Sequence, residues 1–249
     1  MSILEVSGLR KVYTTRFGGS QVEALRSVSF TVEQGEYVAV MGESGSGKTT
    51  LMKLLLKFYE PTQGSILLGG KGLSEYSAHS LRGACGIVMQ DNFIFSDTIK
   101  RNILMGEEYD EARMKRAIEL SCLKEYVDRL PLGVETKVGR DGTGISGGEK
   151  QRLMIARANY KQPQYMMLDE ATSSLDAENE RIITENMERL FHGRTMVVIA
   201  HRLSTVKNAD QIIVLRHGEI AEQGTHRELV ERHGYYFQLV HNQLELAQG

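Results

Sequence analysis

Residues 42–49 constrain this chain more than any other stretch. Their sequence, Gly-Glu-Ser-Gly-Ser-Gly-Lys-Thr, fits the pattern G-x-x-x-x-G-K-[ST] of a phosphate-binding loop. An apolar run, Tyr37 to Met41, precedes the loop, and a helical pattern, Thr49 to Phe58, follows it. Glycines let the backbone bend around a polyphosphate with successive N–H groups pointing inward. The stretch therefore predicts a nucleotide site between a strand and a helix.

Each residue type in this loop has a chemical use. The following helix brings its N-terminal N–H groups and its dipole to the phosphates. Lys48 supplies a mobile positive charge for the β- and γ-phosphates, and the Thr49 hydroxyl is placed to bind magnesium. The predicted nucleotide contacts are Gly42, Glu43, Ser44, Gly45, Ser46, Gly47, Lys48, Thr49 and Thr50. The alternative is an ordinary Gly/Ser-rich turn, which does not account for the complete pattern in its strand–helix context.

The composition is that of a globular protein, with 41% hydrophobic and 25% charged residues among 249. A chain of this length buries one large core or two interlocked lobes. The formal charge of -2 gives no positive excess to hold nucleic acid, so we expect no nucleic-acid partner. Cys85 and Cys122 have neither metal-ligand nor C-x-x-C spacing, and we expect both to be reduced and structural.

The sequence has no run of 18 or more apolar residues, and its N-terminus lacks the basic-then-apolar layout of a signal peptide. We therefore expect a chain that neither spans a membrane nor is exported. If it serves a membrane process, it either docks onto another chain or is a piece of a larger one. The sequence leaves both alternatives open.

Two segments near the N-terminus alternate apolar and polar residues. Ile3 to Val12 and Ala24 to Val32 therefore predict half-buried strands. Tyr13 follows the first strand, where its ring is placed to stack on an adenine base. The alternative is a strand-end tyrosine with a solvated hydroxyl, which is the commoner case for a single Tyr.

Three further apolar runs end in polar residues that suit catalysis: Gly86 to Met89 before Gln90, Tyr165 to Leu168 before Asp169 and Glu170, and Thr195 to Ala200 before His201. In an open α/β sheet, ligands bind at the carboxyl ends of the strands. We therefore predict that Gln90 and Asp169 bind magnesium. Glu170 is predicted to polarise the attacking water, and His201 to contact the γ-phosphate. An isolated Gln is usually solvated, and a lone His is more often structural.

The pattern becomes helical from residue 97 to residue 160, with no strand predicted between the helices. We interpret 97–160 as a helical subdomain inserted into a core formed by 1–96 and 161–249, the whole chain 1–249 being one domain. Later residues continue the core. They predict a hairpin from Gln211 to Gln223, a short helix capped by Thr225, and an amphipathic helix from Gly234 to Ala247.

Ser146 and Glu149 have the spacing of a capping box, which predicts that a helix starts there. Capping alone is a sufficient structural explanation for these two residues. Gly147 and Gly148 are not required by the cap, and they let a bulky anion approach the backbone closely. The chain thus has a second candidate anion site at a helix start, although one nucleotide has only one γ-phosphate end.

The ordered set of motifs resembles an ATP-binding cassette (ABC) ATPase over nearly the whole chain. Tyr13 matches the adenine-stacking aromatic, Gly42 to Thr49 the Walker A motif, Gln90 the Q-loop, Ser146 to Glu149 the signature, Asp169 the Walker B aspartate, Glu170 the catalytic glutamate, Ser174 to Asp176 the D-loop, and His201 the switch histidine. Each match alone is weak, whereas the ordered set is specific. The implied fold class is α/β, a P-loop NTPase (RecA-like) core with an N-terminal antiparallel β subdomain and an inserted α-helical subdomain.

The resemblance also implies a mechanism. A head-to-tail homodimer closes over two Mg-ATP, each held between Walker A of one subunit and the signature of the other, and hydrolysis reopens it. The implied cofactors are ATP and Mg²⁺, and the implied catalytic residues are Glu170, His201, Lys48 and Gln90. The motion drives the transmembrane domain of an exporter, which places the chain in the cytoplasm at the inner face of the cell membrane.

Two positions depart from the family pattern. Glu149 stands where the commonest signature has Gln, a change with little effect on phosphate contacts if Glu149 serves as a cap. The segment Thr136 to Gly142 resembles the exporter loop T-x-V-G-E-x-G, but Arg140 replaces its Glu. This charge reversal leaves the coupling to a membrane domain open.

The resemblance differs between two parts of the chain. Residues 1–56 resemble separate cassette subunits of peptide-resistance and lipoprotein-release transporters, and the chain from about Phe58 resembles peptide or bacteriocin exporters. One hypothesis is a composite or engineered chain with a junction near Leu54 to Pro61. The other is a natural mosaic or an excised domain. The second part predicts a peptide as the exported substrate.

Two other classes of function remain as alternatives. A soluble, non-transport ABC ATPase that acts on DNA or ribosomes would need a coiled-coil insert or a second cassette, and the sequence has neither. An isolated or engineered nucleotide-binding scaffold with little turnover is the other alternative. The presence of Glu170 and His201 argues against it.

Overall fold

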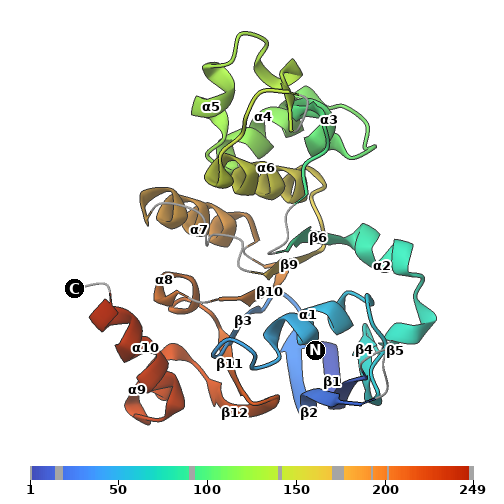
Figure 1. Cartoon of the computed structure of the whole chain (residues 1–249), viewed down its shortest axis with the longest axis vertical. Coiled ribbons are helices and arrows are strands. Elements are labelled where there is room, and N and C mark those ends of the chain that lie inside the picture. Colours follow the sequence, from blue (N-terminus) through green and yellow to red (C-terminus); the bar gives the residue numbers. More distant parts are fainter. Residues whose placement is uncertain are drawn as a thin grey trace. The chain divides into compact units, whose positions relative to one another are not determined.

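The computed structural model describes residues 2–14, 19–89, 93–139, 142–169, 177–191, 193–200 and 202–246. The chain forms two compact units (Figure 1). The first unit consists of Met1–Arg82 and Gly193–Gly249, and the second unit of Gly83–His192. The second unit is thus an insertion in the sequence of the first, and the boundary falls within helix α2 (Ala78–Ala84). The predicted helical subdomain, 97–160, lies within the second unit, and its bounds remain a prediction.

An antiparallel sheet forms the N-terminal part of the first unit. Its order is β2 (Gln21–Glu33), β1 (Ser2–Thr14), β4 (Gln63–Leu68) and β5 (Lys71–Gly72). The two predicted strands are confirmed, and both are longer than predicted because their polar ends still pair, as Thr14 does with Gln21. The buried residues of β1 and β2 alternate except for two steps of three residues, Val6 to Leu9 and Leu25 to Val28, which lie at shifts in the pairing register. They are Leu4, Val6, Leu9, Leu25, Val28, Phe30 and Val32. This half-buried alternation is what the sequence pattern required.

The second set of strands in the first unit has three members that are largely buried on both faces, β3 (Tyr37–Met41), β10 (Thr195–Ile199) and β11 (Gln211–Arg216), and one that is not, β12 (Glu219–Gly224). Strand β3 pairs in parallel with β10 and with β11. Strand β12 pairs antiparallel with β11, so the predicted hairpin is confirmed. Helix α1 (Lys48–Leu55) starts directly after the phosphate loop. This arrangement places the loop at the carboxyl end of the central strand β3.

The C-terminal helices of the first unit begin at sites that the sequence identified. Thr225 and Glu228 form the predicted capping box at the start of α9 (His226–Glu231). Helix α10 (Tyr235–Leu246) follows, and its first backbone N–H groups donate to the Glu222 carboxylate of β12. Short helical segments were not predicted, among them α8 (Leu203–Val206), the 3₁₀ turn Leu73–Glu75, and α2. Segments this short carry no measurable periodicity.

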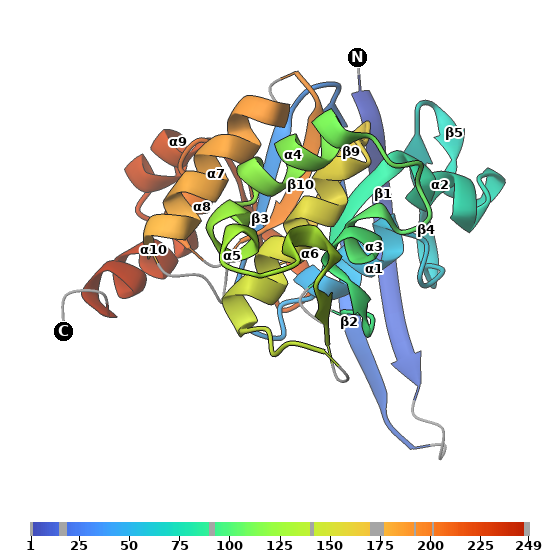
Figure 2. The ribbon, with the colours of Figure 1, turned by 90° about the horizontal axis from the view of Figure 1, so that it is seen from above.

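Within its described residues, the second unit combines two parallel strands with five α-helices. Strands β6 (Cys85–Val88) and β9 (Tyr165–Asp169) pair in parallel. The helices are α3 (Ile99–Leu104), α4 (Glu111–Leu120), α5 (Lys124–Asp128), α6 (Gly147–Tyr160) and α7 (Ala177–Phe191). Four of these helices lie in 97–160, as predicted. Helix α6 packs against α3 and α4 (Figure 2) and also against β6, and its residues Leu153, Met154 and Ile155 are buried.

One prediction for this region was wrong, because a strand does intervene between the helices. Lys137–Val138 (β8) pairs antiparallel with Asp97–Thr98 (β7). Each strand has only two residues, which is too short to produce the alternation by which strands are recognised. The small sheet connects the start of α3 to the segment that leads to α6. Within the described residues, no helix is both long and apolar enough to cross a bilayer.

Candidate active site

The phosphate loop adopts backbone angles that require glycine at three positions. Gly42, Gly45 and Gly47 have φ values of 150°, 78° and 104°. A Cβ atom at Gly42 would lie 2.2 Å from the Leu215 carbonyl oxygen, and one at Gly47 would lie 2.5 Å from the Ala24 carbonyl oxygen. Any residue larger than glycine would clash with the backbone at both positions. The loop is therefore held tightly between β2 and β11.

Lys48 lies folded along the inside of its own loop. It is 6% exposed, and its Nζ donates hydrogen bonds to the carbonyl oxygens of Gly42 (2.7 Å) and Glu43 (2.9 Å). The single ammonium group of Lys48 thus binds two carbonyl groups of the loop. The charge therefore lies at the loop, where a polyphosphate would need it.

The loop fits a polyphosphate by observations independent of its sequence pattern. Helix α1 has Gly47 as its N-cap with no side-chain cap, and it has no acidic residue in its first turn. Ser46 is 4% exposed, and its Oγ has no hydrogen-bond partner among the described residues. A helix start without a side-chain cap leaves donors for an anion. Thr49 and Thr50 lie in the first turn of this helix and are half-buried.

Tyr13 lies at the end of β1, as predicted, and it has an aromatic neighbour that sequence reasoning missed. The ring of Tyr59 lies edge-on to Tyr13, with 5.7 Å between the ring centroids. Lys11 Nζ lies 5.4 Å from the Tyr13 ring centroid and 5.5 Å from that of Tyr59. The exposed pair Phe58-Tyr59 just beyond α1 was the sequence signal for this neighbour. These contacts fix the ring of Tyr13, and its stacking on adenine stays a prediction.

The predicted capping box at Ser146 is confirmed. The Glu149 N–H donates to Ser146 Oγ (3.2 Å), and the Glu149 Oε2 atom accepts from the Ser146 N–H (2.9 Å). The Ser146 hydroxyl also donates to Glu149 Oε2 at 2.7 Å. Ser146 and Gly147 are exposed, and Gly148 is half-buried. The start of α6 is therefore accessible to an incoming group.

The other end of α6 is fixed by a polar network around Asn102. Arg157 of α6 donates from Nε to the Asn102 carbonyl oxygen (2.8 Å) and from Nη1 to the Phe93 carbonyl oxygen (3.3 Å). Asn102 is buried and donates from Nδ2 to the carbonyl oxygens of Phe95 and Thr98, both at 3.0 Å. Burial lowers the pKa of Arg157 to about 10. These bonds attach α6 to the segment that follows Gln90, a predicted magnesium ligand.

The predicted catalytic residues are only partly within the described structure. Asp169 is the last residue of β9 and is completely buried. Gln90, Glu170, His201 and the D-loop residues Ser174 to Asp176 lie outside the described residues, as does Arg140. Tyr13 and Gly42 to Thr50 belong to the first unit, and Ser146 to Glu149 and Asp169 belong to the second. The structure therefore describes the phosphate loop together with Tyr13 in the first unit, and the capped helix start together with Asp169 in the second.

The predicted magnesium ligands are a hydroxyl, an amide and a carboxylate. Oxygen ligands of this kind suit Mg²⁺. Two of these ligands lie in regular secondary structure. Thr49 is in the first turn of α1, and Asp169 is the last residue of β9. Among the described residues, no cluster of three or more His, Cys, Asp or Glu side chains is arranged to hold a metal ion.

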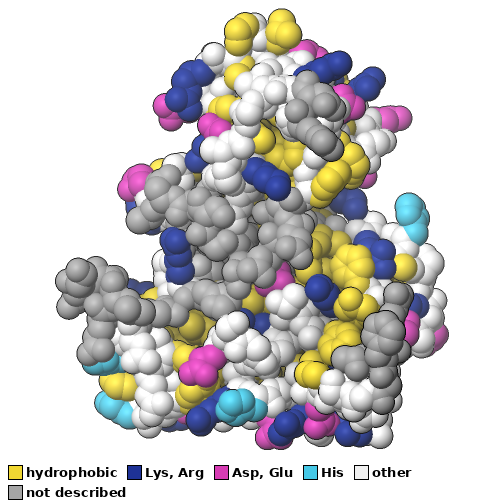
Figure 3. Space-filling view, viewed as in Figure 1, with side chains coloured by type: hydrophobic (Ala, Val, Ile, Leu, Met, Phe, Trp, Pro, Cys, Tyr) yellow, Lys and Arg dark blue, Asp and Glu magenta, His cyan; other side chains and the backbone are white. Residues whose placement is uncertain are grey.

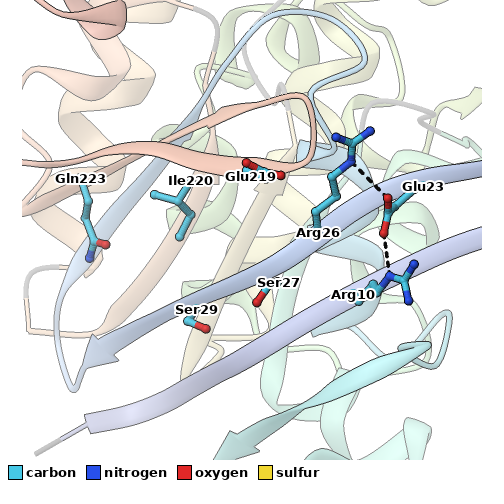
Figure 4. A pocket seen from close by; sticks show the side chains of 8 residues that line it. All are labelled: Arg10, Glu23, Arg26, Ser27, Ser29, Glu219, Ile220 and Gln223. Atoms are coloured by element: carbon cyan, nitrogen blue, oxygen red, sulfur yellow. Dashed lines mark hydrogen bonds and ion pairs between the residues drawn. The ribbon is translucent and has the colours of Figure 1, made fainter.

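A cavity of about 460 Å³ lies elsewhere in the first unit, between β1, β2 and β12 (Figure 4). Its charged side chains compensate one another. Glu23 accepts from Arg10 Nε at 2.6 Å and forms an ion pair with Arg26 Nε at 3.2 Å. Glu219 adds a second carboxylate to the lining. We assign no ligand to this cavity.

The comparisons with known proteins give one family. The family model for "ABC transporter" matches residues 25–173, more than half of the chain. The ATP-dependent lipid A-core flippase of Ralstonia nicotianae is 51% identical over 227 residues, which are 90% of this chain and 38% of that protein. The flippase of the same name from Cupriavidus pinatubonensis is 48% identical over 225 residues, 89% of this chain and 38% of that protein.

A solved structure shares the fold. It is a bacterial Atm1-family ABC exporter with ATP bound, with a TM-score of 0.89 and 39% sequence identity, and the match covers 96% of this chain and 41% of that chain. The chain thus spans about two fifths of the length of these relatives. A match of this coverage runs across residues 54–61, so a single natural relative resembles both segments. This argues against the composite-chain hypothesis.

The phosphate loop and the strand order around it define an α/β P-loop ATPase that binds ATP with Mg²⁺. The chain belongs to the ABC transporter family, and within that family it is a nucleotide-binding domain of the exporter type. The predictions of fold class, ATPase activity and cofactors are therefore confirmed. The predicted peptide substrate has no support among these relatives, whose names give lipid A-core instead.

Proposed function

We propose that this chain is the ATP-hydrolysing part of a lipid exporter and that it works as a head-to-tail homodimer around two ATP molecules. One observation carries the proposal. The chain has two helix starts suited to phosphate, the glycine-bounded start of α1 and the exposed, glycine-rich start of α6. A second copy of the chain would use the α6 start to complete the site formed by the phosphate loop.

The residues divide the chemistry among themselves. Lys48 holds the β- and γ-phosphates, and the phosphate-loop amides surround them. Bound Mg²⁺ would neutralise charge on the phosphates, held by Thr49, Gln90 and Asp169. Glu170 orients and polarises the attacking water as a general base. His201 contacts the γ-phosphate, and Tyr13 stacks on the adenine. Ser146 to Glu149 contact the nucleotide held by the other copy.

Exposed aromatic and aliphatic side chains on each unit favour docking of a membrane domain. Phe58 and Tyr59 are exposed in the first unit, and Phe93, Phe95, Met105 and Leu132 in the second. Hydrophobic side chains are visible at the surface of both units in Figure 3. In the second unit, Phe93 and Phe95 pack edge-on, with their centroids 4.9 Å apart. We infer that the chain works at the cytoplasmic face of the inner membrane, attached through such side chains.

The substrate follows from the relatives rather than from residues of this chain. Both flippases are named for lipid A-core, and this chain is similar to 38% of each. We therefore propose a large amphipathic lipid as the transported molecule, selected by a membrane domain. A peptide remains the alternative substrate to exclude.

The test is the steady-state rate of ATP hydrolysis as a function of protein concentration, with Glu170→Gln as the control. We expect the rate per molecule to rise with concentration, because a complete site needs two copies. Glu170→Gln should abolish turnover while ATP binding persists. A rate that is independent of concentration would contradict the dimer. Tight binding with no turnover by the unsubstituted chain would instead indicate the scaffold alternative.

A further inference from the structure

Three carbonyl groups of the phosphate loop, those of Gly42, Glu43 and Ser46, accept from donors that the fold holds in place. Buried carbonyl groups need such donors. Lys48 supplies the donor for Gly42 and Glu43. The carbonyl oxygen of Ser46 accepts instead from the backbone N–H of Gly218, at 3.1 Å. This donor lies in the turn of the β11–β12 hairpin, far along the sequence.

Gly218 is held from its other side as well. Its carbonyl oxygen accepts from the Arg26 N–H of β2, at 2.7 Å. Its φ of +83° is in the left-handed region, and a Cβ atom there would lie 2.9 Å from the Ala24 carbonyl oxygen. The turn is therefore fixed against β2, and its N–H has a defined direction. Only glycine fits this position without strain.

The direction of this bond determines the direction of a loop amide. The Ser46 carbonyl and the Gly47 N–H belong to one planar, trans peptide, so they point in opposite directions. Holding the Ser46 oxygen toward Gly218 therefore turns the Gly47 N–H to the opposite side. The same hairpin reaches the start of the loop, where the Leu215 carbonyl leaves no space for a side chain at Gly42. The hairpin thus contacts the loop at both ends.

We propose that Gly218 is a positioning residue of the nucleotide site, which fixes the orientation of the Ser46–Gly47 peptide so that the Gly47 N–H is available to phosphate before nucleotide arrives. The proposal rests on the proposed function of the loop as the ATP site. It assigns a role in binding to the β11–β12 turn, which lies outside all the motifs identified in the sequence. Preorganising a donor in this way improves affinity because no rearrangement is needed on binding.

The chain offers a closely matched control for strain. Gly35 also has a φ of +83°, and a Cβ atom there would lie 3.1 Å from a backbone oxygen, that of Gly193. Gly35 lies before β3, whereas the phosphate loop follows β3. Gly35→Ala and Gly218→Ala should therefore cause similar backbone strain, and only the second should disturb the loop.

The experiment measures the dissociation constant of a fluorescent ATP analogue with Mg²⁺, and the midpoint of thermal unfolding without nucleotide. We expect both variants to unfold at lower temperature than the unsubstituted chain. Gly218→Ala should raise the dissociation constant about tenfold, the effect of losing one oriented donor. Gly35→Ala should leave it within about twofold. Glu23→Gln, which disrupts the ion pairs in Figure 4 without touching the turn, should also leave it unchanged.

Equal dissociation constants for Gly218→Ala and the unsubstituted chain would overturn the inference and leave the ATP site standing. Failure of the unsubstituted chain to bind the analogue would overturn both. If Gly218→Ala does not fold, hydrogen exchange of the unsubstituted chain decides. Nucleotide should slow exchange at the Gly218 amide about tenfold, and it should not affect the Gly35 amide, which donates to Thr195 Oγ1. Unchanged exchange at Gly218 with nucleotide bound would refute the proposal.

Discussion

Helices α1 and α6 both begin with glycine-rich sequence, but the chain treats their first N–H groups differently. At α1 the N-cap is Gly47 in the left-handed region, with no side-chain cap and no acidic residue in the first turn. At α6 the N-cap is Ser146, which forms a complete capping box with Glu149. One helix start therefore leaves its donors to a ligand, whereas the other satisfies part of them internally.

This difference suggests different roles for the two helix starts. Uncapped donors beside Lys48 give α1 the means to bind a polyphosphate within one copy of the chain. At α6 the single hydroxyl proton of Ser146 is donated to Glu149, and a carboxylate lies beside it. An incoming phosphate has to compete with this carboxylate. We therefore expect α1 to dominate the affinity for nucleotide and α6 to respond only when a second copy brings its own bound nucleotide.

The largest expected effect is the loss of nucleotide binding in Lys48→Ala. The substitution removes the only loop side chain with a positive charge, and we expect affinity to fall about 100-fold, which corresponds to about 2.7 kcal/mol. Titration with a fluorescent ATP analogue measures it. Lys53→Ala, in the last turn of the same helix, is the control and should bind normally. If Lys48→Ala bound the ATP analogue normally, the start of α1 would not be the main source of nucleotide affinity.

A matched pair of glycine substitutions compares the backbones of the two helix starts. Gly47→Ala should lower the free energy of unfolding by about 2 kcal/mol, because of its positive φ and its contact with the Ala24 carbonyl. Gly147→Ala lies at an exposed helical position and should raise it by up to about 1 kcal/mol. Denaturant unfolding gives both values. A similar loss in both variants would mean that Gly147 is required by the fold rather than by an approaching anion.

Ser146→Ala tests the cap of α6. It should cost about 1 kcal/mol of stability and leave ATP binding by the single chain unchanged. In the Glu170→Gln background, where nucleotide is not consumed, it should also weaken ATP-driven dimerisation measured by sedimentation. Thr225→Ala removes the corresponding cap of α9 at a similar cost. If Thr225→Ala weakened dimerisation equally, stability rather than the α6 start would explain the effect.

The smallest expected effect is that of Glu149→Gln, which keeps a capping side chain but removes its charge. Stability should fall by a few tenths of a kcal/mol, through the lost charge–dipole interaction. ATP-driven dimerisation should become tighter, because the repulsion between carboxylate and phosphate is gone. Sedimentation at low and high salt measures this, and the gain should shrink at high salt. Weaker dimerisation would show that the carboxylate helps the site.

Glu228→Gln is the control for Glu149→Gln, since Glu228 caps α9 in the same way. The Thr225 backbone N–H, and then the Thr225 hydroxyl, lower the pKa of Glu228 below its ordinary value. The contribution of this carboxylate to stability is therefore complete above its ordinary pKa and is lost as the pH falls through the lowered one. The stability difference between the unsubstituted chain and Glu228→Gln should vanish in acid, with no effect on dimerisation at any pH.

Local sequence predicted those features whose partners lie within a few residues. The phosphate loop and the boxes at Ser146 and Thr225 depend on neighbours three to seven positions away, and the structure confirms their conformation. Glycine spacing and capping chemistry act at this range, so the residues alone identify them. The same holds for the hairpin β11–β12, whose strands are joined by a two-residue turn.

Features that depend on distant partners were not predictable. Nothing near Ser46 indicates that its carbonyl accepts from Gly218. The pair Phe58-Tyr59 is an aromatic signal in the sequence, but nothing near Tyr13 indicates that Tyr59 lies against it. The pairing of β7 with β8 was missed because each strand has two residues. The predicted roles of Gln90, Glu170 and His201 remain predictions, since these residues lie outside the described structure.

The position of the second unit within the sequence of the first affects how the chain folds during its synthesis. Strand β3 ends at Met41, whereas its partners β10 and β11 lie between Thr195 and Arg216. At a translation rate of about 5–20 residues per second, roughly 10 to 30 s pass between the synthesis of β3 and that of its partner strands. The contiguous second unit emerges complete during that interval. The nascent phosphate loop therefore acquires its Gly218 donor only after the whole second unit has been translated.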